Sequence, residues 1–434
     1  MSLFLSLRRR CSCRHWAMLA LALACVATPA WSAAPLAFDE AVRLAVARAP
    51  TLQARRSQAD AAREEAARAA ALPDPKLTLG LANVPVTGAD AFDQRADDMT
   101  MTQVGVMQEF PARAKRQARQ AVADRMIEQA QALTLAERAA VRSAAAEAWI
   151  ALWAAQREVE ALQAQREQSA LAIRIAKARL AGGTGTAADA LAVQSAALEL
   201  DNRIDAAEAE VAAARATLAR WLGIEPEAVV ITDASPDLTV LSVDEATLLA
   251  SVDRQGPLLV WRSRESVAEG EVTAAIAETR PDWSMSAMYG QRARAPGGMP
   301  RSDMLTIEFS IGLPLLTRNR QDRGVAARRA ELDAVAAEHE DARRLQLEAV
   351  RRALAEWHGL KRQVARKEQQ ALPLAHDRAQ VALAAYRGGG PLQPWLDARR
   401  DELELHIEHA RHLGELGRVW SALAYLLVDE ETQP

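Results

Sequence analysis

Histidines gather near the C-terminal end of the chain. His406, His409 and His412 recur every three residues, with Glu404 and Glu408 among them. Residues three apart share one face of a helix, so His406 and His409 could bind the same metal ion. These two histidines are therefore candidate metal ligands. Solvated polar residues on a helix surface would give the same pattern, and the sequence leaves both interpretations open.

The motifs of common catalytic sites are absent from the sequence. It contains no Gly-rich phosphate loop, no Ser-His-Asp arrangement and no His-Glu-x-x-His motif. The three cysteines are Cys11, Cys13 and Cys25, so the chain beyond Cys25 has no thiol, disulfide or cysteine-based metal site. The sequence predicts a protein that is not an enzyme, with no catalytic residues and no cofactor.

The first residues have the pattern of an export signal. Arginines cluster between Arg8 and Arg14, and the apolar stretch 17–26 is shorter than the ~20 residues needed to span a bilayer. Ala30-Trp31-Ser32 offers small residues for cleavage, so we expect 1–32 to be a signal peptide. Lipidation at Cys25 is the alternative. Either predicts an exported protein.

Charge and hydropathy narrow the function further. The formal net charge is −4, and loss of the four signal arginines would make it −8. An acidic exported protein is a poor partner for nucleic acid. No later segment is apolar for the ~18 residues of a membrane helix, so a membrane role would have to come from strands.

The sequence contains an internal duplication. Phe38-Asp39-Glu40-Ala41 returns as Val243-Asp244-Glu245-Ala246, and Leu198-Glu199-Leu200 returns as Leu403-Glu404-Leu405, 205 positions later. We divide the chain into a first structural repeat, 33–235, and a second, 236–434. A duplicated unit with few strands and long helices indicates an elongated assembly rather than an enzyme pocket.

The first repeat is dominated by one long helical stretch. Short helices are expected over 39–49 and 50–71, followed by two strands. Residues 112–181 then contain neither glycine nor proline and predict one continuous helix. Its apolar seam has spacing 4-3-4-3-4-3: Val141, Ala145, Ala148, Leu152, Ala155, Val159 and Leu162. Trp149 and Trp153 add a second stripe, which suits neighbours on two sides; a helix hairpin with one partner is the alternative.

Glycine-rich turns close both long helices. The first turn is Gly182-Gly183-Thr184-Gly185, followed by a helix over about 188–221. In the second repeat the long helix covers about 318–387, and Pro373 should kink it. Its turn is Gly388-Gly389-Gly390-Pro391-Leu392, followed by a helix to about 427.

Strands are expected in pairs. Leu77, Leu79 and Leu81 alternate with polar or small residues, and 283–290 and 305–313 alternate more clearly. The return strand 99–110 changes phase, which suggests a bulge. Five methionines lie in these regions, and lipid-facing filler is favoured over a copper relay as their role: Met99, Met101, Met107, Met285 and Met288. One apolar face is typical of outer-membrane strands, although a hairpin on a soluble core would also alternate.

The order of these elements resembles the TolC family of outer-membrane efflux proteins. Three stretches are similar to the CzcC-like and CusC-like heavy-metal efflux branch: Leu72-Pro73-Asp74-Pro75, Val104 to Pro111, and Gly390-Pro391-Leu392-Gln393-Pro394. The resemblance implies a mainly α fold with a small β part. It implies a homotrimeric helical barrel that continues into a shared twelve-strand outer-membrane β-barrel, four strands per chain, with most of the chain in the periplasm.

The resemblance also implies partners and a site. The glycine turns would form a periplasmic tip that meets a periplasmic adaptor (membrane fusion protein) and, through it, an inner-membrane RND-type pump. Asp189 and Asp397 match the carboxylates that narrow the tunnel inside the tip. Acids near helix N-termini are also favoured by the helix dipole, which is a second explanation for both residues.

The implied function is the outer-membrane channel of a tripartite efflux system that exports heavy-metal cations. A multidrug or type I secretion conduit of the same fold is an alternative. A periplasmic coiled-coil adaptor or structural protein is an alternative from another class. An adaptor would carry a single hairpin within a β-rich half, whereas this chain repeats a small strand pair among helices.

Overall fold

The described part of the chain is mainly helical, with a small sheet, as the sequence predicted. The structure is a computed structural model that describes residues 35–427, so the expected signal peptide and Cys25 lie outside the described residues. The first half contains α1 (Phe38–Arg48), α2 (Pro50–Ala69), β1 (Lys76–Ala82), β2 (Met101–Phe110), α3 (Arg113–Gln163), α4 (Arg166–Ala181) and α5 (Ala187–Leu222).

The second half follows the same order. After the short α6 (Glu245–Ala250) come α7 (Gly256–Ala277), β3 (Trp283–Arg292), β4 (Met304–Ile311), α8 (Gln321–Arg366), the π-helix η4 (Lys367–Ala371), α9 (Leu372–Arg387) and α10 (Gln393–Ala424). Short 3₁₀ turns are η1 (Pro226–Ala228), η2 (Val252–Arg254) and η3 (Thr317–Asn319). The exact division of the repeats at residues 235 and 236 stays a prediction.

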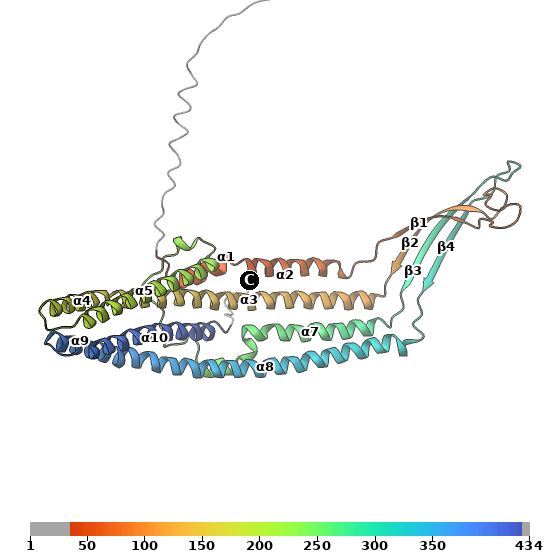
Figure 1. Cartoon of the computed structure of the whole chain (residues 1–434). Helices are drawn as coiled ribbons and strands as arrows, with labels where there is room; N and C mark the ends of the chain where they lie inside the picture. The colour runs from red at the N-terminus through yellow and green to blue at the C-terminus, as the bar shows by residue number, and fades with distance from the viewer. Residues whose placement is uncertain (1–34, 428–434) are drawn as a thin grey trace, which may run out of the picture.

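The molecule is long and has two different ends. Its helices lie side by side in an extended body, and the sheet projects from one end (Figure 1). The turns between α4 and α5 and between α9 and α10 lie together at the other end. Within residues 35–427, no helix is both long enough and apolar enough to cross a membrane.

The sheet is a four-stranded antiparallel meander in the order β1-β2-β3-β4. Leu79, Val104, Tyr289 and Leu305 are paired across it, as are Leu77, Val106, Ala287 and Ile307. Paired residues point to the same side of a sheet, so these apolar side chains share one face. That face is open: Leu79 is 71% exposed and Leu305 is 69% exposed. The other face carries smaller and more polar side chains.

The predicted bulge in the second strand is wrong. The pairing of β2 with both neighbours runs without a skip from Met101 to Met107. The change of phase in the sequence arises because methionines lie on the more polar face as well. A Cβ on Gly290 would lie 2.5 Å from Met101 Sδ, and one on Gly105 would lie 2.5 Å from Met288 Cγ. These methionines fill space above glycines on the more polar face. The prediction that methionines of this region face lipid stays untested.

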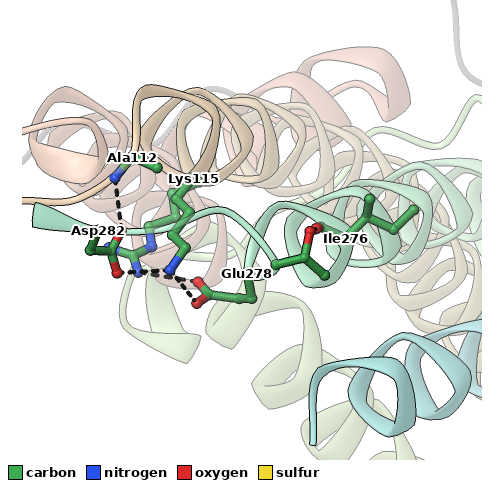
Figure 2. A network of polar contacts seen from close by, with 7 residues as sticks. Ala112, Lys115, Ile276, Glu278 and Asp282 are labelled. Carbon is green, nitrogen blue, oxygen red and sulfur yellow. Dashed lines mark hydrogen bonds and ion pairs between the residues drawn. The ribbon is translucent and has the colours of Figure 1, made fainter. Parts of the chain in front are cut away.

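A network of charges joins the sheet to the helices (Figure 2). The Asp282 carboxylate, just before β3, accepts from the Ala112 backbone N–H at 2.8 Å and from Lys115 Nζ at 2.7 Å. Lys115 also lies 3.3 Å from the Glu278 carboxylate, and its side chain is only 7% exposed. The Asp282 carbonyl accepts from Gly312 N at 2.8 Å. Asp282 thus fixes the segment before β3 to the segments that follow β2 and β4.

The predicted seam of the long helix is buried. Val141, Ala145 and Leu152 are at most 1% exposed, and α3 packs on α5, α7 and α10. Trp149 is fully buried against Phe38, with ring centroids 5.5 Å apart. The interpretation of a helix with neighbours on more than one side is therefore confirmed, and the single-partner hairpin is not.

The prediction of one uninterrupted helix over 112–181 is wrong. The helix breaks at Ala164 and Gln165, where the Gln165 N–H bonds to the Leu162 carbonyl, three residues back. The second long helix is interrupted 205 residues later along the repeat, by the π-helix before Pro373. Proline lacks the N–H that an α-helix would use there, so the regular α-helix is interrupted at the predicted position. The kink itself stays a prediction. Both long helices are thus broken at the same level.

Tryptophan side chains hold an irregular connection against the middle of the body. Trp153 Nε1 donates to the Asp233 carbonyl at 3.0 Å, Trp357 Nε1 to the Leu238 carbonyl at 2.9 Å, and Trp420 Nε1 to the Val240 carbonyl at 2.8 Å. Indole N–H groups that are mostly buried need acceptors, and backbone carbonyls outside regular structure need donors. These bonds therefore satisfy both and fix the link between the two halves.

Candidate functional site

The two glycine turns have the same backbone design. Gly183 and Gly389 have φ of +69° and +101°, which only glycine adopts readily. The N–H of Gly182 bonds to the Ala178 carbonyl, and that of Gly388 to the Ala384 carbonyl. The glycines thus end α4 and α9 by capping their last carbonyls. The predicted tip segments, Gly182–Gly185 and Gly388–Leu392, are turns of matching geometry.

Arg179 binds the two turns to each other. Its Nη1 donates to the carbonyls of Tyr386 at 2.7 Å and Gly390 at 2.9 Å. Its Nη2 donates to the carbonyls of Thr184 at 3.2 Å and Gly389 at 3.3 Å. The guanidinium also lies 4.4 Å from the centroid of the Tyr386 ring. One cation therefore holds the ends of both hairpins, because each bond to a charged donor is stronger than a neutral one.

A small apolar core supports the turns. It consists of Ala172, Ala176, Ala190, Val193, Leu383, Tyr386, Leu392 and Trp395. Tyr386 is 1% exposed and Trp395 is 2% exposed. Burial raises the pKa of Tyr386, while the nearby Arg179 cation opposes this and the Asp189 carboxylate adds to it. Residues from both repeats thus form one packed unit at this end.

Asp189 stabilises the start of α5. The Thr186 hydroxyl accepts from the Asp189 N–H at 3.0 Å, and the Asp189 carboxylate accepts from the Thr186 N–H at 3.3 Å. This reciprocal capping box satisfies two N–H groups of the helix terminus. The explanation of Asp189 as a helix-terminal acid is therefore confirmed, and its role in an aperture stays a prediction.

Asp397 has a different setting. It lies beyond the first turn of α10, which contains no acid, and is half-buried. Its carboxylate accepts from Gln393 Nε2 at 2.8 Å. The helix-dipole explanation is wrong for Asp397, because the dipole effect is confined to the first turn. An aperture role for Asp397 stays a prediction.

A buried ionic cluster lies at the level of the helix breaks, and the sequence analysis missed it. Arg399 Nη1 donates to Glu402 Oε2 at 2.8 Å, and Arg399 Nη2 donates to the Gln165 carbonyl at the break at 3.0 Å. Glu402 Oε1 lies 2.9 Å from His376 Nδ1. The side chains of Arg399 and Glu402 are 6% and 2% exposed. The only signal in the sequence was the three-residue spacing of an arginine and a glutamate.

The candidate metal ligands lie on α10 beside this cluster. Burial lowers the pKa of His406 and of His409, while Glu402 opposes this for His406 and Glu368 opposes it for His409. Burial therefore favours the neutral form of both imidazoles. No group of three or more His, Cys, Asp or Glu residues among residues 35–427 could hold a metal ion. His406 and His409 belong to no such group.

The structure resembles solved outer-membrane channels over most of its length. The outer-membrane channel OprN is 18% identical, with 89% of each chain covered and a TM-score of 0.72. The outer membrane protein VceC of Vibrio cholerae is 18% identical, covering 90% of this chain and 96% of that chain, with a TM-score of 0.70. CusC is 14% identical, covering 89% and 91%, with a TM-score of 0.72.

Sequence comparisons add no relative. No family model matches the chain, and no curated protein matches it. The likeness to CusC is no greater than that to OprN, so the structures do not single out the CusC-like branch. The chain has the TolC-type fold that its sequence predicted, the fold of solved outer-membrane channels.

Proposed function

We propose that the chain is the outer-membrane channel of a tripartite efflux system. The observation that carries this proposal is the exposed apolar face of the sheet at one end of the helical body. Leu77, Leu305 and Phe309 are each more than 65% exposed on it. An apolar face of this size is costly in water and stable in lipid. The likeness to solved channels supports the same conclusion.

The sheet favours an assembly of three chains. Within residues 35–427 each chain supplies four strands, and β1 and β4 have one neighbour each. Unpaired strand edges cannot remain in lipid, so the edges must pair with other copies. Three chains would close a twelve-strand sheet in the outer membrane, and their helices would continue the wall into the periplasm.

The tip is where the partners would bind. Gly182–Gly185 and Gly388–Leu392 lie at the end farthest from the sheet (Figure 1). They would meet the periplasmic adaptor, which connects the channel to an inner-membrane RND-type pump. Asp189 and Asp397, close to the turns, would form the aperture carboxylates, since rings of acids favour cations.

Heavy-metal cations are the proposed cargo. This proposal rests on the resemblance of the sequence to the heavy-metal branch. The same wall would serve a multidrug or type I secretion conduit equally well. Deletion of the gene should sensitise the source bacterium to zinc, cadmium, cobalt or copper salts. Sensitivity to dyes and antibiotics alone would instead support the multidrug alternative.

The alternative of a periplasmic adaptor or structural protein fits the structure less well. The four strands form one sheet to which both repeats contribute, and this sheet stands apart from the helices (Figure 1). The channel proposal is tested by extracting the protein from outer-membrane fractions in detergent. A trimer that conducts ions in planar bilayers is expected. A soluble periplasmic monomer would contradict the proposal.

A further inference from the structure

The contact between the two repeats within one chain is a template for a contact between chains. In the sheet, the repeats meet where β2 pairs with β3. In the part of the chain that the structure describes, the outer strands β1 and β4 each have one neighbour. We propose that β4 of one chain pairs with β1 of a second copy in the register that β2 and β3 show. The inference rests on the proposed trimer and assigns its strand register and a salt bridge.

The two hairpins can be superposed residue by residue. β1 pairs with β2 through Leu77 and Val106, and β3 pairs with β4 through Met285 and Phe309. The flanking prolines have the same spacing in both hairpins. Pro73 and Pro281 lie four residues before Leu77 and Met285, and Pro111 and Pro314 lie five residues after Val106 and Phe309. Leu77 is therefore the counterpart of Met285, and Val106 that of Phe309.

This correspondence converts the internal register into one between chains. Met107 pairs with Ser286, so their counterparts Ser310 and Thr78 should pair. Val106 pairs with Ala287, so Phe309 should pair with Leu79 of the neighbouring chain; in the same way Ile311 should pair with Leu77.

The predicted register also matches the faces of the sheet. It joins Phe309 and Ile311 to leucines on the same apolar face. A slip by one residue would bring polar side chains onto that face. The hydrophobic pattern of the strands and the positions of the flanking prolines thus support the same register.

The charge network beside the sheet should be repeated between chains. Pro73-Asp74 corresponds to Pro281-Asp282, and Asp282 holds Ala112 N–H and Lys115. Asp74 is exposed, and it makes no hydrogen bond or ion pair with any residue in the described range 35–427. Its network is incomplete in one chain.

The missing cation is an arginine of the neighbouring chain. If the offset between Val106 and Phe309 is applied to Lys115, its counterpart is Arg318. If the 205-residue offset between the two repeats is applied instead, its counterpart is Arg320. Both arginines are exposed and precede α8, as Lys115 lies at the start of α3. We therefore assign the Asp74 carboxylate to Arg318 or Arg320 of the next chain.

Disulfide cross-linking tests the register. Thr78→Cys and Ser310→Cys are introduced together, and the full-length trimer in detergent is oxidised with copper–phenanthroline. Directly paired Cβ atoms lie about 5 Å apart, whereas diagonal pairs lie about 7–8 Å apart and are too far for a disulfide. Covalent dimers and trimers are expected for this pair. Far less product is expected for Gly80→Cys with Ser310→Cys.

The chain offers a matched control. Met107→Cys with Ser286→Cys has the same geometry within one chain and should form a disulfide without any covalent ladder. Since residues 35–427 contain no cysteine, the background is low. The mass of the unoxidised particle is measured separately. If the particle is a trimer but Thr78→Cys with Ser310→Cys gives no covalent dimers or trimers, the register is overturned. More covalent product from Gly80→Cys with Ser310→Cys would also overturn it. A monomer would overturn the proposed function together with this inference.

A double-mutant cycle tests the salt bridge. Asp74→Asn should lower the temperature at which the trimer dissociates in detergent, and so should Arg318→Gln combined with Arg320→Gln. The triple variant should lose no more than the larger of the two effects, because both changes remove one interaction. Additive losses would overturn the salt bridge and leave the register in place.

Discussion

At the scale of single residues, arginine side chains donate hydrogen bonds to backbone carbonyls that have no partner within a helix. Arg179 binds carbonyls of both glycine turns, and Arg399 binds the Gln165 carbonyl where the long helix breaks. Guanidinium groups suit this task because they offer several donors and stay charged. Neither contact was evident from the sequence, since each joins residues more than 200 positions apart.

Replacing Arg179 should loosen the tip. Arg179→Ala removes the donors to the second turn, and a hydrogen bond to a charged group contributes about 1.5–3 kcal/mol where it is shielded. Amide hydrogen exchange at 386–390 should become faster, and bilayer conductance should increase. Arg179→Lys keeps the charge but cannot bind several carbonyls at once, so it should have an intermediate effect. Unchanged exchange in both variants would contradict the clamp.

Removing one partner of the buried pair should be costly. Glu402→Gln leaves the Arg399 cation buried without its counter-ion, which costs about 3–5 kcal/mol in comparable pairs. Arg399→Met combined with Glu402→Leu should recover most of that loss, because neither charge remains. Denaturant unfolding of the detergent-solubilised protein measures both. If Glu402→Gln were as stable as the wild type, the buried pair would not contribute to stability as described.

Histidine burial predicts a loss of stability in mild acid. Burial lowers the pKa of His406 in the folded state. Below the unfolded pKa of about 6.5, the unfolded chain therefore binds a proton that the folded chain does not. This group contributes a penalty that grows as pH falls through about 6.5 and is absent at higher pH. His406→Gln should flatten the thermal stability profile between about pH 6.5 and 5; an unaltered slope would contradict the prediction.

At the scale of elements, glycine, proline and apolar spacing predicted most of the structure. The turns, the strand pairs, the seam of α3 and the interruption near Pro373 all follow from local rules. The break at Ala164 and Gln165 was missed because neither residue disfavours a helix. It is stabilised by Arg399 from a distant helix, and such a tertiary contact leaves no local signal. For the same reason the clamp of Arg179 was not predicted, although the turns it joins were.

The π-helix should depend on Pro373. Pro373→Ala restores the N–H that an α-helix requires, so the second long helix should straighten and exchange at 367–372 should slow. Pro394→Ala is the matched control, because Pro394 lies in the first turn of α10 where its missing N–H costs little. Slower exchange only in the first variant is expected. Equal behaviour of both variants would assign the π-helix to another cause.

At the scale of the whole molecule, the two ends of the body present different surfaces. The sheet presents an apolar face, the tip presents polar turns, and the body between them is held by helix seams and tryptophan bonds. The charge network at Asp282 connects the sheet rigidly to the helices. The proposed channel thus has separate regions for lipid and for protein partners.

Membrane assembly should distinguish the two faces of the sheet. Ile307→Lys places a charge on the apolar face, which costs about 2–4 kcal/mol near the bilayer centre. Thr306→Lys, one residue earlier, places the same charge on the opposite face of β4. The yield of trimer in the outer membrane should fall for the first variant and remain near wild type for the second. An equal yield for both would contradict a lipid-facing role.

The Arg179 clamp exists in only one of the two repeats. The residue that matches Arg179 ahead of the second turn is Ala385, which has no side-chain donor. In the proposed trimer, six turns would surround the tip, and arginine would join them only in pairs, within each chain. The ring would then open along its three seams between chains before the joined pairs separate. A tip that opens in this way would have a triangular opening. The three seams at which a bound adaptor could promote opening would lie 120° apart around the trimer axis.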